Sequence, residues 1–284
     1  MISKLPVDFA EILEPENAKL LTKGNYGEIW TCTLNDGTSQ RKREIEVWRR
    51  LIHPNIVPLL GLTSDFGCKL PPDVILPGMV SPYLSKGNLH DYLRVNHLSS
   101  LERLRILQNI IEGLLFLHSH GIIHGDLRPS NVLIDDRQQA CLIDFGLSLI
   151  EGELEGTPRW PQTFGAVRWR APELVPFAEC QTTNFQPRLT KACDIYSFGG
   201  VALQTIADTV PYEEIANTQL VLMQLMIRRL PIRPHSPMLT DTLWLFIQRC
   251  WGSVPTARLT AVEVKGELAD FVEQERETML TASL

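Results

Sequence analysis

HGDLRPSN, the run from His124 to Asn131, is followed at once by the apolar triplet Val132–Ile134. A little further on, the chain reads LIDFG over Leu142–Gly146. Each of these two motifs therefore contains or borders a short apolar run of the kind that forms a buried strand. The pattern predicts two loops, held next to two short strands, that present the carboxylates of Asp126 and Asp144 and the amide of Asn131.

Two carboxylates and an amide on neighbouring loops suit the transfer of a phosphoryl group. One carboxylate, Asp126, would accept the proton of an attacking hydroxyl, while Asn131 and Asp144 would hold Mg²⁺ against nucleotide phosphates. A structural explanation also exists, because Asp126 could cap a turn and Asn131 could bond to local backbone. The occurrence of both runs together, with Ala171-Pro172-Glu173 downstream, favours phosphoryl transfer.

The composition is that of an ordinary globular protein of 284 residues, enough for one large domain or one two-lobed unit. A net charge of −6 lacks the basic surplus of a dedicated nucleic-acid-binding protein. The six cysteines stand singly, without metal-ligand spacing, which favours reduced thiols in an intracellular protein. No run approaches the ~18 apolar residues of a membrane span, and the first residues contain no apolar signal segment. We therefore expect an intracellular, cytoplasmic location.

The hydrophobic pattern changes along the chain. Its first part contains β-type runs around one helix, with strands expected at Leu20–Leu21, Glu28–Leu34, Ile56–Leu62 and Val74–Val80 and the helix over Ile45–Ile52. Later runs are helical, with helices expected at Leu101–Ser119, Tyr196–Asp208, Thr218–Ile227, Leu239–Cys250 and Val262–Glu275. The pattern predicts a small strand-rich lobe followed by a larger helical lobe.

These motifs resemble those of a protein kinase domain, and the resemblance covers residues 17–275. It implies an α+β, bilobal fold with a small antiparallel sheet and one helix in the N-lobe and a mainly helical C-lobe. The resemblance places the N-lobe and hinge at 17–84, the C-lobe at 85–275, and tails at 1–16 and 276–284. It implies ATP and Mg²⁺ as cofactors, a protein substrate, and a monomer that acts in intracellular signalling. The run Val167–Glu173 resembles the tyrosine-kinase-like group, whose members mostly phosphorylate Ser or Thr.

The resemblance also assigns roles to individual residues. Asp126 is implied as the catalytic base, Arg128 as a positive charge near the transferring phosphate, and Asn131 as a catalytic-loop metal ligand beside Asp144. The residues implied to bind the nucleotide are Gly24 and Gly27 of the phosphate loop, Ile29 and Leu133 above and below the adenine, Glu44 of the N-lobe helix, Asp144, and the hinge residues Ser81, Pro82 and Leu84.

Other matching residues are implied to be structural. Asp194 would anchor the catalytic loop from a helix, and Arg258 would pair with Glu173. A column of side chains would join the lobes, formed by Trp48, Leu59, Phe145 and His124.

The sequence departs from the family pattern in the N-lobe. Only Thr38–Arg43 separate Gly37 from Glu44, and these residues contain no apolar side chain, so the third strand and its phosphate-binding lysine are not visible. Lys42 or Lys23 would have to supply the missing charge. Smaller departures are Thr22 for the first loop glycine, Gly125 for the catalytic-loop arginine, Arg128 for the catalytic-loop lysine and Ala166 for a threonine.

Three functions are compatible with these residues. The first is a protein kinase that transfers the γ-phosphate of ATP to Ser or Thr. The second is a pseudokinase that senses ATP or acts as a scaffold, which the missing lysine favours because electrostatic clamping of phosphates supplies much of the catalysis. The third is a small-molecule phosphotransferase, which Asp194, Arg258 and Ala171-Pro172-Glu173 disfavour.

Overall fold

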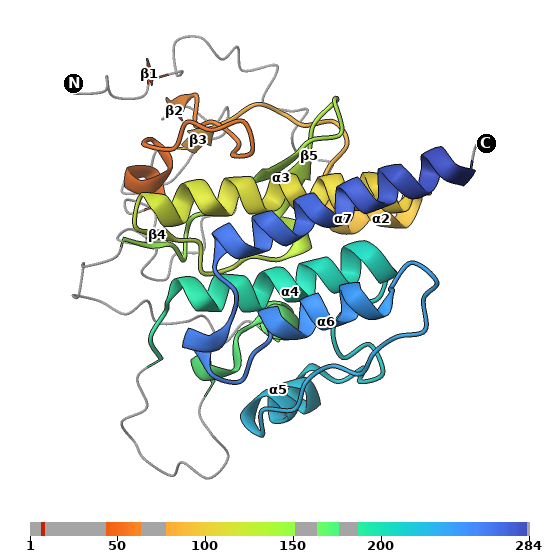
Figure 1. The fold of residues 1–284 in the computed structure, drawn as a ribbon. Coiled ribbons are helices and arrows are strands. Elements are labelled where there is room, and N and C mark those ends of the chain that lie inside the picture. Colours follow the sequence, from red (N-terminus) through yellow and green to blue (C-terminus); the bar gives the residue numbers. More distant parts are fainter. Residues whose placement is uncertain (1–6, 9–43, 64–77, 151–163, 176–186, 283–284) are drawn as a thin grey trace.

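The computed structural model describes residues 7–8, 44–63, 78–150, 164–175 and 187–282 (Figure 1). A small sheet and one short helical segment, residues 44–48, lie at one end of the molecule. The other helices form a larger body next to them (Figure 1). This two-lobed α+β arrangement confirms the predicted fold class.

The small sheet has the strand order β1-β2-β3, with β1 at Val7–Asp8, β2 at Gly61–Thr63 and β3 at Gly78–Val80. β2 and β3 are antiparallel, whereas β1 runs parallel to β2. No pattern in the sequence predicted β1, which lies within the segment 1–16 that we expected to be a tail. The strands expected at 20–21 and 28–34 lie outside the described residues.

The predicted strand Ile56–Leu62 is wrong in its first half. Ile56 forms an isolated bridge with Leu142, and the N–H of Val57 donates to the Leu142 carbonyl at 3.0 Å. Pro58 follows, and proline has no N–H with which to continue a strand ladder. Pairing in the small sheet therefore begins at Gly61, and residues 55–57 tie the small lobe to a strand of the larger lobe instead.

The larger lobe contains α2 (Leu89–Val95), α3 (Ser100–Ser119), α4 (Lys191–Ala207), α5 (Thr218–Met226), α6 (Asp241–Cys250) and α7 (Ala261–Ala282). α4 begins at Lys191, not at the predicted Tyr196. The apolar pattern missed this first turn because it contains Asp194, a buried acid that interrupts the pattern. α7 continues past Glu275 into the segment 276–284 that we expected to be a tail.

α3 has a well-defined start that the sequence encodes. The Ser99 hydroxyl accepts a bond from the backbone N–H of Glu102 at 3.3 Å, and the Glu102 carboxylate accepts one from the Ser99 N–H at 2.8 Å. This capping box satisfies two backbone donors that a helix start would otherwise leave without partners. The helix ends at Ser119, with His120 as its C-cap, before Gly121, whose φ of 69° favours glycine.

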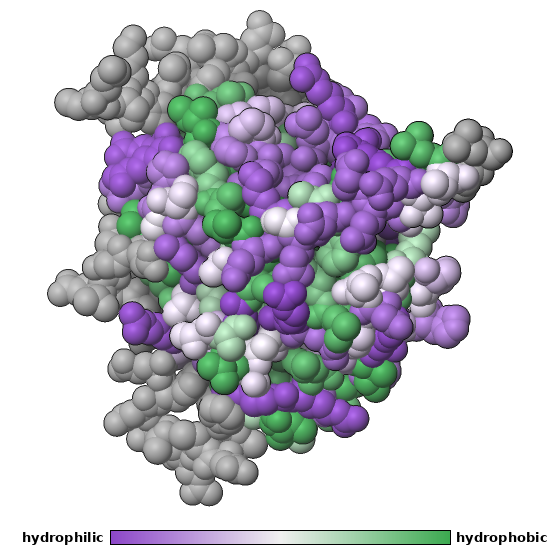
Figure 2. All heavy atoms as spheres, in the orientation of Figure 1, coloured by the Kyte–Doolittle hydropathy of each residue, from purple (hydrophilic) through white to green (hydrophobic). Residues whose placement is uncertain are grey.

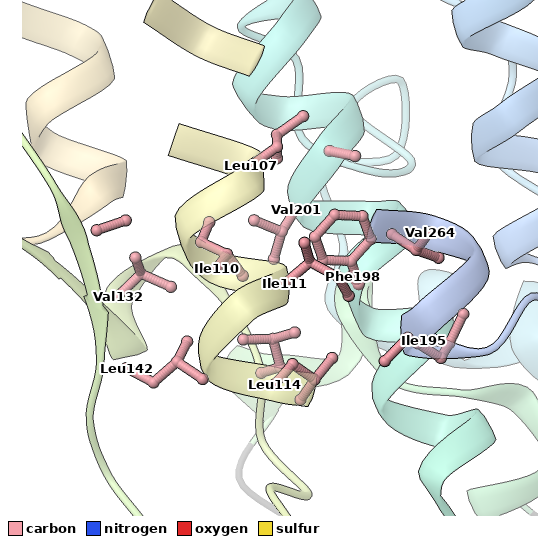
Figure 3. Packing of buried hydrophobic residues seen from close by; sticks show 14 of the residues in the cluster. Leu107, Ile110, Ile111, Leu114, Val132, Leu142, Ile195, Phe198, Val201 and Val264 are labelled. Atoms are coloured by element: carbon pink, nitrogen blue, oxygen red, sulfur yellow. The ribbon is translucent and has the colours of Figure 1, made fainter. Parts of the chain in front are cut away.

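The core is built around α3. Figure 3 shows the inner face of α3 between the strands that carry Val132 and Leu142 and the helix α4. The packed side chains are at most 1% exposed and include Leu107, Ile110, Ile111, Leu114, Val132, Leu142, Ile195, Phe198, Val201 and Val264. Burial of one large apolar side chain contributes about 1.5–3 kcal/mol. The strands that border HGDLRPSN and LIDFG are therefore held against a helix of the hydrophobic core.

Two small two-stranded sheets surround the two motifs. β4 (Ile122–Ile123) pairs with β7 (Leu149–Ile150), and β5 (Val132–Ile134) pairs with β6 (Ala140–Leu142), both antiparallel. Short 3₁₀ turns complete the lobe at η3 (Pro129–Asn131), η4 (Phe164–Trp169), η5 (Pro172–Leu174) and η6 (Pro255–Ala257). The motif residues therefore lie at the ends of paired strands, as the sequence predicted.

The surface is mixed in character. The face shown in Figure 2 is mainly hydrophilic over α3 and α7, and hydrophobic residues gather near α5. Leu220, Met223 and Ile227 on and just after α5 are 48%, 56% and 59% exposed. Among the described residues, none of the helices combines the length and the apolar character that crossing a bilayer requires.

The expected pair of Arg258 and Glu173 is confirmed. Nη1 and Nη2 of Arg258 donate to the two carboxylate oxygens of Glu173 at 2.6 and 2.7 Å, and the arginine side chain is fully buried. Further bonds reach the carbonyls of Ala192 and Gly252, each at 2.9 Å. Burial raises the pKa of Glu173, but the bonds and charge of Arg258 outweigh it and leave this pKa below its usual value. The pair fastens η5 to the start of α4.

We expect Arg258→Met to lower the free energy of unfolding by about 3–5 kcal/mol, because it leaves a half-buried carboxylate without its cation. Urea unfolding of the purified protein measures this loss. Arg233→Met is the matched control, since the Arg233–Asp241 pair is exposed and should contribute about 1 kcal/mol or less. Equal losses in the two variants would contradict the scaffold role of Arg258.

Candidate active site

The backbone of the loop 124–126 is fixed by Asp194 of α4. This carboxylate is 1% exposed and accepts bonds from the N–H groups of His124 and Gly125, both at 2.9 Å. Nε2 of His118 on α3 lies 2.8 Å from the same carboxylate. The expected anchoring role of Asp194 is confirmed. His118 was not identified from the sequence, although it lies one helical turn after Leu114 on the buried face of α3.

Gly125 stands where the family pattern has an arginine, and the backbone at this position favours glycine. Its φ is 83°, a conformation that L residues with side chains rarely adopt. A Cβ at this position would lie 2.8 Å from the carbonyl oxygen of Leu147 and 2.9 Å from Cδ2 of Leu189. Glycine therefore allows the loop to turn tightly between Asp194 and Leu147.

We expect Gly125→Ala to destabilise the fold by about 1–3 kcal/mol, because the left-handed conformation and the contact with Leu147 both penalise a side chain. The midpoint of thermal unfolding measures this effect. Gly266→Ala is the opposite control: Gly266 lies in α7 with open space around it, so alanine should add up to about 1 kcal/mol. A Gly125→Ala protein as stable as the natural one would contradict this account.

Asp126 is held by the other end of HGDLRPSN. The turn η3 brings Asn131 back, and its Nδ2 donates to the Asp126 carbonyl at 2.8 Å and to Oδ2 at 3.0 Å. Nε of Arg128 lies 3.2 Å from Oδ2 of Asp126 but is not directed for a hydrogen bond, so this contact is ionic. The side chain of Asp126 is 15% exposed. Of the predicted residues, Arg128 and Asn131 therefore both contact Asp126.

Burial raises the pKa of Asp126 above its ordinary value. The charge of Arg128 opposes this shift, whereas the negative charge of Asp144 adds to it. The net shift is upward, so desolvation outweighs the adjacent arginine. A carboxylate with a raised pKa accepts a proton more readily than an exposed aspartate, which suits a general base.

The raised pKa has a consequence for stability. Below the unfolded pKa of about 3.8 Asp126 is protonated in both states, and as pH rises only the folded state resists ionisation. We therefore expect Asp126→Asn to gain stability over the natural protein as pH rises from about 4 towards neutrality. Thermal unfolding across pH measures the difference.

Glu263→Gln is the control of opposite sign. The pKa of Glu263 is lowered, chiefly by its bonds with Thr260 at the start of α7, so the natural residue should gain relative stability as pH rises. A Tm difference for Asp126→Asn that shrinks with rising pH would show that burial does not dominate at this carboxylate.

Asn131 directly precedes β5 and Asp144 follows β6, so both lie at the open end of the β5–β6 hairpin. The N–H of Ile143 donates to the Asn131 carbonyl at 3.1 Å, which continues the ladder and places Asp144 next to the catalytic loop. Asp144 has a φ of 65°, and its Oδ1 accepts a bond from the N–H of Gly146 at 3.3 Å. The hairpin register thus brings the two predicted metal ligands to one edge.

These two side chains fit Mg²⁺. One amide oxygen and one carboxylate are hard oxygen ligands, and Mg²⁺ commonly takes one or two protein carboxylates and completes its shell with water and phosphate. Nδ2 of Asn131 is engaged with Asp126, which leaves Oδ1 as the ligand atom. In the described part of the chain, no group of three or more His, Cys, Asp or Glu residues forms a metal site by itself.

An aromatic column connects the two lobes beside this edge. The rings of Trp48 and Phe145 are 6.0 Å apart between centroids, and those of Phe145 and His124 are 5.5 Å apart. Leu59 packs against the same core. These contacts confirm the expected column. Through Trp48, the column packs the helical segment 44–48 against Phe145, the residue that follows Asp144. Glu44, at the start of that segment, is half-buried.

The predicted hinge residues follow β3. Ser81 and Pro82 are half-buried, and Leu84 packs against the core. The chain then turns, with the Gly87 N–H donating to the Leu84 carbonyl at 3.1 Å and Ile134 of β5 bonding to Gly87 at 2.9 Å. This places the end of the hinge beside Leu133, whose neighbour across an isolated bridge is Asn88.

Several predicted residues cannot be placed. Gly24, Gly27 and Ile29 lie outside the described residues, as do Thr22, Lys23 and Thr38–Arg43. One neighbour of Asp126 was missed by sequence reasoning: Arg170 lines a small cavity together with Asp126. Its only signal was its place in the run Val167–Glu173.

Comparison with known proteins identifies the family. The family model for the protein kinase domain matches residues 24–268, so the chain belongs to the protein kinase family. This match agrees with the implied bilobal fold and with ATP and Mg²⁺ as the cofactors that such domains use. It sets aside the small-molecule phosphotransferase.

The individual relatives share low sequence identity with this chain. A serine/threonine/tyrosine-protein kinase of Arabidopsis thaliana is 31% identical over 222 residues, covering 77% of this chain and 51% of that protein. A probable leucine-rich repeat receptor-like protein kinase of the same plant is 30% identical over 224 residues, covering 72% and 26%. A probable serine/threonine-protein kinase of Dictyostelium discoideum is 26% identical over 258 residues, covering 87% and 25%. The chain spans about half or less of the length of these relatives.

Proposed function

We propose that this protein kinase domain is an active enzyme that transfers the γ-phosphate of Mg-ATP to Ser or Thr of a protein substrate. The observation that carries the proposal is the Asp126 carboxylate, which is largely shielded from solvent, oriented by Asn131 and raised in pKa. A scaffold has no chemical need for such a residue, whereas phosphoryl transfer needs a base that accepts the proton of the substrate hydroxyl. One relative is named a probable serine/threonine-protein kinase and another a serine/threonine/tyrosine-protein kinase, and these names support Ser or Thr as the acceptor.

The proposal gives each placed residue a role. Asp126 accepts the hydroxyl proton. Arg128, whose Nε lies 3.2 Å from the Asp126 carboxylate, stabilises negative charge on the transferring phosphoryl group. Asn131 and Asp144 hold Mg²⁺, which would neutralise charge on the phosphates when bound. Glu44, Ser81, Pro82, Leu84 and Leu133 border the nucleotide, together with Gly24, Gly27 and Ile29. We further propose that residues 17–275 form one kinase unit that acts as a monomer in the cytoplasm.

A pseudokinase remains the second candidate, and one observation favours it. The six residues between Gly37 and Glu44 contain no apolar side chain, so the sequence does not reveal a third strand with its lysine, and residues 38–43 lie outside the described residues. Without that lysine, clamping of the phosphates depends more strongly on Arg128 and the metal.

The experiment compares the natural protein with Asp126→Asn in Mg-ATP binding and in phosphorylation of a generic Ser/Thr protein substrate. Because general-base catalysis contributes roughly 10²–10⁴-fold, we expect the turnover rate to fall by about that factor while ATP binding is retained. Phosphoamino-acid analysis of the product identifies the acceptor residue.

Tight ATP binding without transfer, unchanged by Asp126→Asn, would overturn the enzyme and leave the nucleotide-sensing scaffold. Product that contains phosphotyrosine alone would overturn the Ser/Thr assignment.

A further inference from the structure

A second cavity lies at the C-terminal end of α4. Its volume is about 430 Å³, and its walls come from α2, the start of α3, and the end of α4 with the loop that follows. Gln204 lines this cavity and lies roughly 15 Å further along the axis of α4 than Asp194. The cavity is therefore separate from the catalytic loop that Asp194 anchors, and its volume suits a small-molecule ligand.

Gln204 is a buried amide with an unused acceptor. The residue is 4% exposed, and its Nε2 lies 2.8 Å from Nδ1 of His90 on α2. Its Oε1 is also buried and accepts no hydrogen bond within the described part of the chain. A buried acceptor without a donor costs free energy. A ligand that brings a donor to Oε1 is therefore stabilised at this point of the cavity.

Arg103 of α3 also lines the cavity, but it is already paired. Its Nη1 donates to Oδ1 of Asp208, the C-cap of α4, at 2.7 Å. The same side chain donates to the carbonyls of Thr205 at 2.6 Å and Leu98 at 3.2 Å, and it is only 5% exposed. The charges of Arg103 and Asp208 thus compensate each other, so this pair gives the cavity no net charge.

The other charged residues of the lining lie on two different sides. Glu213, in the loop after α4, is exposed and presents a carboxylate. Arg94, in the last turn of α2, is exposed and lies one helical turn after His90 on the same face of that helix. Neither Glu213 nor Arg94 forms an ion pair or a side-chain hydrogen bond with another residue that the structure describes.

His90 adds a donor to the α2 side. Because the amide Nε2 of Gln204 can only donate, Nδ1 of His90 accepts, and the neutral imidazole carries its proton on Nε2. The α2 side of the cavity therefore offers donors and a positive charge. The α4 side offers an acceptor and a negative charge.

This arrangement selects ligands by charge. An anion is attracted to Arg94 and repelled by Glu213, and a cation meets the reverse. A neutral ligand displaces water from both charged groups without replacing its hydrogen bonds. A molecule with one charge of each sign satisfies both sides through charge-assisted hydrogen bonds. Leu93 and Val210 also line the cavity and provide contact for an aliphatic chain.

We propose that this cavity binds a small zwitterion of the amino-acid type. Its ammonium group donates to Oε1 of Gln204 and pairs with Glu213, while its carboxylate pairs with Arg94. The proposal goes beyond phosphoryl transfer and uses none of the residues assigned to that reaction. It is therefore tested independently of the proposed function.

The experiment uses four ligands with the same aliphatic side chain and measures their binding by isothermal titration calorimetry at about pH 7, which requires no phosphoryl transfer. L-Leucine carries both charges, leucine amide only the ammonium, N-acetyl-leucine only the carboxylate, and N-acetyl-leucine amide neither. We expect saturable binding of leucine. Each analogue should bind about tenfold more weakly or worse, because it leaves at least one charged group of the cavity without a partner.

Three variants locate the ligand in the cavity. Gln204→Met removes the acceptor at similar volume and should weaken leucine binding by about tenfold. Arg94→Glu should shift the preference from leucine to leucine amide, because the ligand carboxylate then meets a negative charge. Arg137→Glu makes the same charge change in the exposed turn between β5 and β6, and it should leave all four affinities unchanged.

Binding of N-acetyl-leucine or leucine amide to the natural protein as tightly as leucine would overturn the zwitterion, and the absence of saturable leucine binding would overturn the site. If Gln204→Met does not fold, Arg94→Glu still decides. A leucine affinity that Arg94→Glu leaves unchanged would place the ligand elsewhere and overturn the proposal.

Discussion

The carboxylate of Asp194 is the point on which the candidate site depends. It is buried in α4, the helix packed against α3 in the core, and it accepts the backbone N–H groups of both His124 and Gly125. Burying a carboxylate without hydrogen-bond partners would cost free energy. The N–H groups of the loop therefore stabilise the buried carboxylate, and the carboxylate in turn fixes the backbone of the loop. His118 approaches the same carboxylate from α3. The loop that carries Asp126 is consequently tied to two core helices by one side chain, and the positions of its functional groups follow from the packing of the core.

The pKa of Asp126 is set by opposing effects of unequal size. Burial and the charge of Asp144 disfavour the ionised form, while Arg128 favours it, and the net result is a raised pKa. A fully exposed aspartate would be a weak proton acceptor, and one paired tightly with arginine would be weaker still. Arg128 approaches without a directed hydrogen bond, so its charge remains available to a second anion. Arg170 lines a small cavity together with Asp126 and adds a second positive charge near it.

Features encoded by local spacing could be predicted from the sequence. α3 follows from its apolar period and from Ser99 and Glu102, and the order of Asp126, Asn131 and Asp144 around two apolar triplets places them at strand ends. Features that need three-dimensional packing could not be predicted in this way. The periodicity concealed the first turn of α4 because Asp194 is polar and buried, and Pro58 broke a run that hydrophobicity alone marks as a strand. His118 lies beside Asp194 and Arg170 lies beside Asp126, and both neighbours are far away in the chain, so no local sequence pattern predicts these positions.

The β5–β6 hairpin has a further consequence for how this site tolerates change. Val132 faces Leu142 and Ile134 faces Ala140, and the Ile143 to Asn131 bond closes the open end of the ladder. A slip of one residue would turn the buried side chains outward, so the register is set by the core rather than by the exposed turn at 135–139. The distance between Asn131 and Asp144 is therefore insulated from insertions or deletions in that turn, which can vary in length while the two proposed metal ligands keep their places.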